Sequence, residues 1–181
     1  PALAGHATRA APSTDRRGPP PANGASAALQ LAPPYAYDAT WAPPPAASRP
    51  LDVALAGGEG MLLADAASHQ VHVYDGAGRL VDRWDAPASI AVTGTEAVVV
   101  PMRVAVDHAA VEAHVLWQRW ALPRLAAPVP ESIWLERRGL AGSGSIAVHA
   151  LAFREVGDLA WHAESAQLFL AADQALHRVD P

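Results

Sequence analysis

The chain has 181 residues, of which 51% are hydrophobic and 17% are charged, and its net charge is −5. This length suits one domain with an additional tail, and the hydrophobic fraction is sufficient for a buried core. The acidic balance does not favour nucleic-acid binding, which requires basic patches. The sequence has no cysteine, which excludes disulfides, thiolate catalysis and cysteine-ligated metal centres. No apolar run reaches the ~18–20 residues of a transmembrane helix.

Residues 1–49 are rich in proline and alanine and predict a tail that leads into an extended arm. Residues 1–28 have almost no large apolar side chains, which indicates disorder in isolation. In residues 29–49 the prolines favour polyproline II, so we expect this arm either to fold back on its own chain or to dock on another subunit. Its candidate partner contacts are aromatic: Tyr35, Tyr37 and Trp41. Long tails of this kind are common in exported chains, so we expect an extracellular or periplasmic location.

Residues 50–84 predict a four-stranded antiparallel sheet. Alternating apolar residues at Leu51, Val53 and Leu55 indicate a strand with one buried face. A short apolar run at residues 61–64 and a β-rich run at residues 71–74 predict two further strands. Asp75 and Gly76 begin a hairpin turn that leads into an outer strand, and we expect a positive φ at Gly76.

Several residues of this stretch stand in the order and spacing of an NHL-type repeat: Pro50, Val53, Leu63, Ala64, Asp65, His69, Val71, Val73, Tyr74, Asp75 and Gly78. The stretch resembles a blade of that family, or of its six-bladed β-propeller relatives. The resemblance implies a propeller architecture. It implies no particular activity, because propellers include enzymes, ligand binders and scaffolds.

The rest of the chain contains weaker copies of the same pattern, and we expect blades near residues 50–86, 87–122, 123–156 (degenerate) and 157–181. Residues 89–94 repeat the first strand at an interval of 37 residues. We therefore predict an all-β, propeller-like fold of three to four antiparallel blades, either incomplete or completed by a partner. The alternative is a small β-sandwich. Asp65 and Asp173 occupy equivalent places in two repeats, so we expect both carboxylates to close turns through backbone N–H groups.

Few residues indicate chemistry, and we predict no catalytic residue, metal ligand or cofactor. The eight histidines show no metal-ligand spacing, so we expect them at the surface or in turns. His162 and Glu164 follow an inner strand and are candidate loop contacts for a ligand. Among the six tryptophans, three suit sheet-to-sheet packing: Trp84, Trp117 and Trp161. Trp120 and Trp134 flank a proline-rich stretch and are candidate partner contacts.

Two classes of function are compatible with these patterns. The first is a non-enzymatic propeller module for protein–protein interaction or assembly, whose partner is another protein or further blades of the same precursor. The second is a lactonase-like hydrolase with carboxylates around a central metal, and a fragment of a longer NHL-repeat protein is also possible. Such a site needs metal ligands at the ends of the inner strands, and the residues expected there are poor ligands: Leu55, Ala56, Thr93, Gly94, Trp161 and His162. The sequence therefore favours the non-enzymatic module.

Overall fold

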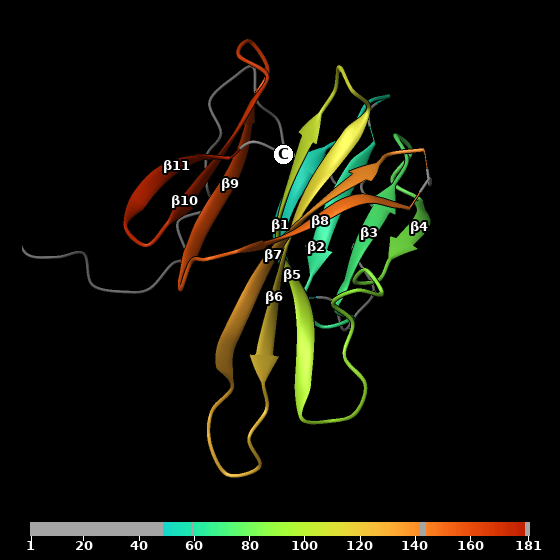
Figure 1. Ribbon diagram of the computed structural model, residues 1–181. Coiled ribbons are helices and arrows are strands. Elements are labelled where there is room, and N and C mark those ends of the chain that lie inside the picture. The colour runs from blue at the N-terminus through green and yellow to red at the C-terminus, as the bar shows by residue number, and fades with distance from the viewer. Residues whose placement is uncertain (1–48, 59, 142–143, 180–181) are drawn as a thin grey trace, which may run out of the picture. The chain divides into compact units, whose positions relative to one another are not determined.

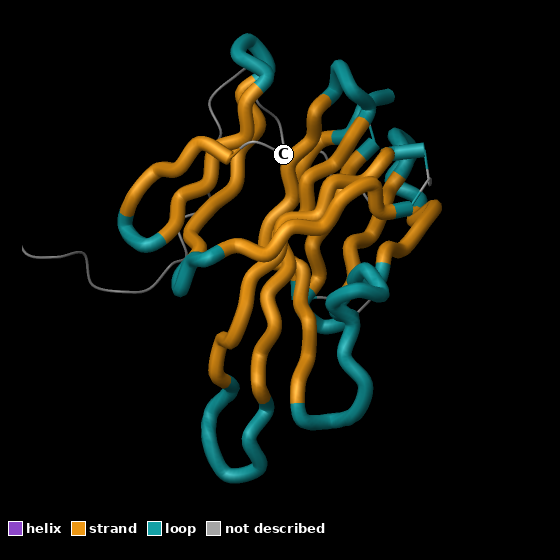
Figure 2. Tube along the Cα trace, in the orientation of Figure 1, coloured by secondary structure: helices purple, strands orange, loops and turns teal. Residues whose placement is uncertain are grey.

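The computed structural model describes residues 49–58, 60–141 and 144–179. Within these ranges the chain is all-β, with eleven strands in three antiparallel sheets and no helix (Figures 1 and 2). No helix among the described residues is therefore long and apolar enough to cross a membrane. The predicted arm residues Tyr35, Tyr37 and Trp41 lie outside the described ranges.

The first sheet confirms the predicted four-stranded unit. It contains β1 (Pro50–Leu55), β2 (Met61–Asp65), β3 (Gln70–Tyr74) and β4 (Leu80–Trp84), each hydrogen-bonded to the next in chain order. All three pairings are antiparallel. The sheet is therefore a meander, which is the expected form of one blade.

The buried face of β1 is the opposite of the predicted one. Val53 and Leu55 are 53% and 69% exposed, whereas Ala54 packs against a core cluster. The reason lies in the register, because Ala54 pairs with Leu62 and shares its side of the sheet. Leu62 faces the second sheet, so the small side chains of β1 turn inward and its larger ones turn outward.

The second sheet differs from the predicted division into two blades at residues 87–122 and 123–156. It is a single four-stranded meander of β5 (Ala97–Asp107), β6 (Glu112–Ala121), β7 (Val129–Gly139) and β8 (Ser145–Leu151). The physical reason is length, since β6 has 10 residues and pairs with β7 almost from end to end. The strands assigned to a degenerate blade therefore complete the sheet that β5 begins.

The predicted inner strand at residues 89–94 is also wrong. Residues 88–90 form a turn in which the Ile90 N–H donates to the Pro87 carbonyl at 2.9 Å. Ile90 is nevertheless buried in the core between the first two sheets. Its hydrophobicity therefore reflects packing of the connection, and β5 begins at Ala97.

The third sheet has three strands, β9 (Val156–His162), β10 (Gln167–Ala172) and β11 (Ala175–Val179). Its order is β9-β10-β11, again a meander in chain order. Each of these strands lies where the sequence predicts one within residues 157–181, to within a residue or two at the ends.

The second sheet packs through both of its faces. Val115 and Trp117 of β6 contribute to a cluster with Leu62 and Trp84 of the first sheet. Leu116, which lies between them in sequence, belongs to a separate cluster with Leu168 of the third sheet. Adjacent residues of a strand point to opposite faces, so β6 supplies side chains to both cores. The prediction that Trp84, Trp117 and Trp161 pack between sheets is confirmed.

The first strands of the three sheets are linked to one another. The Asp52 carboxylate of β1 accepts a hydrogen bond from the Val104 N–H of β5 at 2.9 Å. The Arg103 Nε of β5 donates to the Gly157 carbonyl of β9 at 2.7 Å and lies 3.7 Å from the Asp158 carboxylate. Three meanders that pack face to face and meet at their first strands have the arrangement of successive propeller blades.

A pair of glycine substitutions tests the β3–β4 turn. The positive φ that the sequence placed at Gly76 is found at Gly78, where φ is 73°. A β-branched residue in this left-handed region costs about 1–2 kcal/mol. We expect Gly78→Val to lower the free energy of unfolding by at least that amount, and the control Gly76→Val to change it by less than about 0.5 kcal/mol. Urea unfolding measures both, and equal effects would contradict the turn geometry.

His114 predicts a loss of stability in acid. It is 1% exposed and its ring stacks on Trp161 with centroids 5.2 Å apart. Burial lowers the pKa of His114 from 6.5 to about 4, Asp107 opposes this shift and Arg137 adds to it. Below pH 6.5 the unfolded chain takes up a proton that the folded chain does not, so the folded state loses stability as the pH falls towards 4, by about 3 kcal/mol in total.

We expect His114→Phe to reduce this acid-dependent loss and to keep the ring stack. The measurement is the free energy of unfolding at pH 7 and at pH 4.5 for the unaltered chain and the variant. The matched control is His149→Phe, because His149 is exposed on β8. If the loss between the two pH values is the same in all three proteins, His114 is not its source.

Candidate interaction groove and the Asp65 turn

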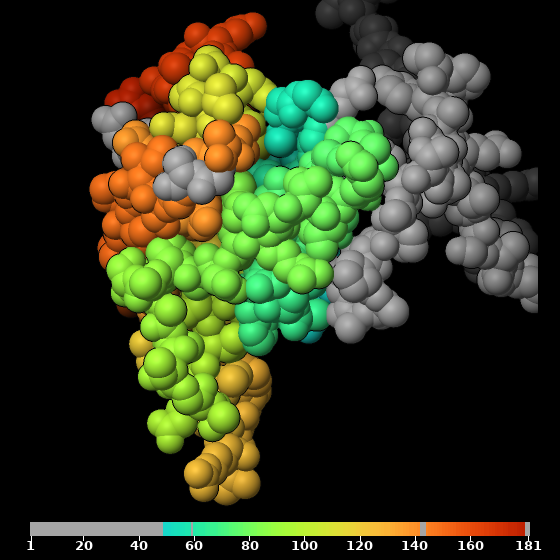
Figure 3. Space-filling model, turned by 90° about the vertical axis from the view of Figure 1, so that its right-hand side faces the viewer, coloured from blue at the N-terminus to red at the C-terminus, as the bar shows by residue number. Residues whose placement is uncertain are grey.

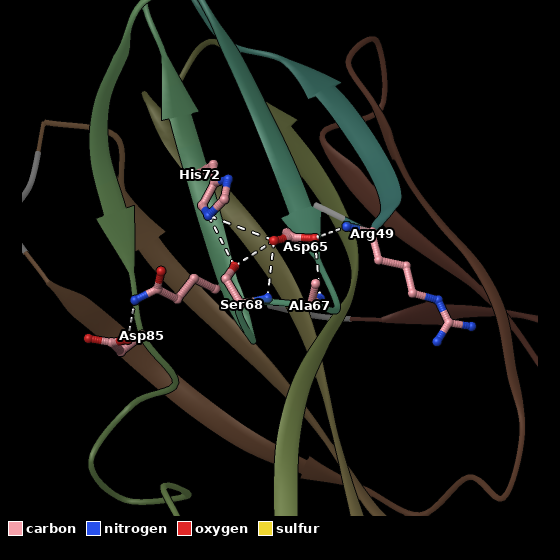
Figure 4. A network of polar contacts seen from close by, with 7 residues as sticks. Arg49, Asp65, Ala67, Ser68, His72 and Asp85 are labelled. Carbon is pink, nitrogen blue, oxygen red and sulfur yellow. Dashed lines mark hydrogen bonds and ion pairs between the residues drawn. The ribbon is translucent and has the colours of Figure 1, made fainter. Parts of the chain in front are cut away.

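Asp65, the last residue of β2, organises the turn that follows it (Figure 4). Its carboxylate accepts backbone N–H bonds from Ala67 at 3.2 Å and Ser68 at 3.1 Å, and the Ser68 hydroxyl donates to it at 2.6 Å. It also accepts the backbone N–H of Arg49 at 2.5 Å, from the residue before β1. One side chain therefore fixes both the β2–β3 turn and the start of the blade.

The surroundings keep Asp65 ionised. Burial raises the pKa of Asp65, but the hydrogen bonds from Ser68, Arg49 and Ala67 outweigh burial and hold the pKa below its ordinary value. His72 of β3, 2% exposed, lies beside it. Burial lowers the pKa of His72, Asp65 opposes this shift, and Arg83 adds to it, so the imidazole is neutral at pH 7.

Ser68, His72 and Asp65 have the residue types of a catalytic triad but a different geometry. The Ser68 Oγ lies 3.0 Å from the His72 Nε2 and also donates to the Asp65 carboxylate. The carboxylate lies 3.9 Å from that same ring nitrogen. In a hydrolase triad the acid contacts the nitrogen opposite the serine. The group therefore closes a turn and leaves no free nucleophile.

Aspartates also accept backbone N–H bonds at strand ends in the other two sheets. Asp173, which follows β10, accepts backbone N–H bonds from Arg154 at 3.0 Å and Glu155 at 2.8 Å, just before β9. Asp107, at the end of β5, accepts those of Ala109 and Ala110. The prediction that a carboxylate closes the following turn is confirmed for Asp65, and Asp107 is a second case that the sequence did not indicate. The Asp173 carboxylate instead holds the segment before β9, as Asp65 holds Arg49.

An apolar groove of about 440 Å³ lies beside the Asp65 turn. Its lining comes from the start of β1, from β5, from the end of β6 and from the β6–β7 loop: Arg49, Leu51, Ala66, Val98, Val100, Met102, Trp120, Leu122 and Pro128. Figure 3 shows the β6–β7 hairpin, in gold, at the lower end of the view. Leu125 at its tip is fully exposed, at 102%.

Trp120 and Arg49 give the groove its chemical character. Trp120 is half-buried and is paired in register with Val98 on one side and Pro130 on the other. Arg49 is exposed. Its backbone N–H is held by Asp65, so its position is fixed while its side chain extends from the network in Figure 4. The groove thus combines an apolar wall, one indole and one guanidinium.

The remaining candidate residues do not gather at this groove. Trp134 is half-buried and packs against the core between the first two sheets, and its role as a partner contact stays a prediction. His162, the last residue of β9, and Glu164, in the β9–β10 turn, are both exposed, and the His162 Nδ1 lies 2.8 Å from the Ser165 Oγ. Among the described residues, no three His, Asp or Glu side chains are placed to hold a metal ion.

Three buried polar residues were not anticipated from the sequence. His72 and His114 lie in the interior, so the expectation of surface or turn histidines is wrong for both. Glu136 of β7 is 0% exposed and accepts a hydrogen bond from the Trp117 indole N–H at 2.8 Å. The apolar neighbours that bury each of them come from distant parts of the chain, which strand patterning does not reveal.

Comparison with known proteins does not assign this chain to a family. No protein-family model matches the chain, and no curated protein is similar to it in sequence.

The contacts of Asp65 and Asp173 predict different losses of stability when each aspartate is replaced by alanine. Asp65→Ala leaves the backbone donors of Arg49, Ala67 and Ser68 without their charged acceptor in a buried setting, so we expect a loss of about 2–3 kcal/mol in the free energy of unfolding. In the matched control Asp173→Ala, water can replace the exposed carboxylate, so the expected loss is below about 1 kcal/mol. Urea unfolding measures both, and equal losses would contradict this assignment.

Proposed function

We propose that the chain is a non-enzymatic, propeller-like module that binds a protein segment in the groove beside Trp120. The observation that carries the proposal is the groove itself, in which a half-buried indole lies among apolar side chains. Aromatic side chains in such positions are the commonest anchors of protein interfaces. The exposed hairpin tip at Leu125 extends the apolar surface next to it.

The architecture supports an assembly role. Three blade-like sheets leave the outer face of β1 with Val53 and Leu55 exposed, and such apolar surfaces commonly mark interaction sites. Either another protein or further blades of the same precursor would suit this surface. The resemblance of residues 50–84 to an NHL-type repeat agrees with such a module, and the proline- and alanine-rich N-terminal segment favours an extracellular or periplasmic location.

The lactonase-like alternative receives less support. That chemistry needs carboxylates at the inner strands that are free to bind a metal ion. Asp52 already accepts hydrogen bonds from the Val53 and Val104 N–H groups. Asp158 accepts the Leu159 N–H and lies near Arg103. Both carboxylates therefore join strands, which favours a structural use.

Site-specific photo-crosslinking tests the proposed binding function. A benzophenone amino acid placed at Leu122, on the groove wall, should form a discrete protein adduct when the full chain is exposed to an extract of its source cells. Trp120→Ala should remove at least nine-tenths of that adduct without a change in melting temperature, because the groove loses its aromatic anchor.

The matched control carries the same probe at Val111, which is 55% exposed in the β5–β6 turn. No discrete adduct is expected there. Adducts of equal yield at both positions, or none at position 122, would exclude the groove as a binding site. The purified chain is also assayed on a panel of lactones and esters with divalent metal ions. Hydrolysis of any of these compounds would contradict the proposal that the chain is not an enzyme.

A further inference from the structure

The groove combines an apolar wall with one positive charge, and this combination restricts the kind of segment that it can bind. Its wall is apolar, with Trp120 at the end of β6, and Arg49 lies at the start of β1. Within the described ranges, no acidic side chain forms an ion pair with the Arg49 guanidinium. A segment that fills the groove should therefore carry an aromatic or apolar anchor and one carboxylate.

Residues 38–48 of this chain, DATWAPPPAAS, have this composition. They contain one aromatic residue, Trp41, and one acidic residue, Asp38. They lie outside the described ranges and lead directly into Arg49. A proline-constrained segment loses little conformational entropy on binding, which suits recognition in a groove.

Chain geometry favours the groove of a second copy over the segment's own. Asp65 fixes the backbone of Arg49. The three prolines Pro43 to Pro45 favour an extended polyproline II form, which advances about 3.1 Å per residue. Trp41 precedes Arg49 by eight residues, so such a segment carries its indole about 25 Å from Arg49. Two copies related by a twofold axis can exchange these segments symmetrically.

We infer that residues 38–48 of one copy bind in the groove of a second copy, with Trp41 against Trp120 and the Asp38 carboxylate paired with Arg49. This inference rests on the proposed function, because it names the protein segment that the groove binds. The exchange is reciprocal, so each pair of copies has two identical contacts.

The test is the native mass of the full chain over a range of concentrations, measured by analytical ultracentrifugation. We expect a species of twice the 18.9 kDa chain mass. Trp41→Ala and Trp120→Ala should each raise the dissociation constant at least tenfold, because both remove the aromatic contact. Asp38→Arg and Arg49→Glu should each do the same by placing like charges together.

The double variant Asp38→Arg/Arg49→Glu is the decisive control. It restores opposite charges, so its dissociation constant should return to within about threefold of the unaltered chain. Misfolding of Arg49→Glu alone cannot produce this rescue. Val111→Ser, in the exposed β5–β6 turn outside the groove lining, should leave the native mass unchanged.

Three results would overturn the inference: a monomer at all concentrations, a dimer that tolerates Trp41→Ala, or single charge variants that the double variant does not rescue. The adduct from position 122 separates this failure from failure of the proposed function. An adduct with a protein of different mass would leave the groove as a binding site but refute self-exchange. Absence of any adduct would refute the proposed function.

Discussion

The described fold depends on apolar packing against both faces of the sheet formed by β5–β8. Trp117 and Leu116 are neighbours on β6 and are both fully buried, one towards the first sheet and the other towards the third. Burial of one such large side chain contributes roughly 2–3 kcal/mol. The first and third sheets each bury one face in this way, so the central sheet joins two hydrophobic cores into one folded unit.

Glu136 and His114 are buried polar residues of the central sheet, one at each of its two interfaces, and the two differ in their hydrogen bonding. Glu136 is satisfied by the Trp117 indole, by the Ser145 hydroxyl and by a longer contact to Arg138. This network links β6, β7 and β8 at the interface with the first sheet. At the other interface, neither ring nitrogen of His114 has a hydrogen-bond partner among the described residues, which makes a neutral ring the form compatible with folding.

The Asp65 turn connects the stability of a blade to the proposed interaction surface. Its carboxylate holds the backbone of Arg49, and Arg49 and Ala66 both line the groove. The carboxylate that closes the β2–β3 turn therefore also positions a charged residue at the proposed binding surface. Because the side chain of Arg49 takes no part in the turn, its charge can be altered while its backbone stays in place.

The local residue pattern was enough to predict the all-β class, the meander at residues 50–84 and the turn closed by Asp65, because alternation, Asp-Gly turns and Asx turns are local. It did not determine which face of β1 is buried, since Ala54 and Leu55 exchange their expected roles through the register with β2. Nor did it determine that residues 97–151 form one sheet. Strand pairing and the burial of His114 and Glu136 depend on residues far apart in sequence, which come together only in the folded structure.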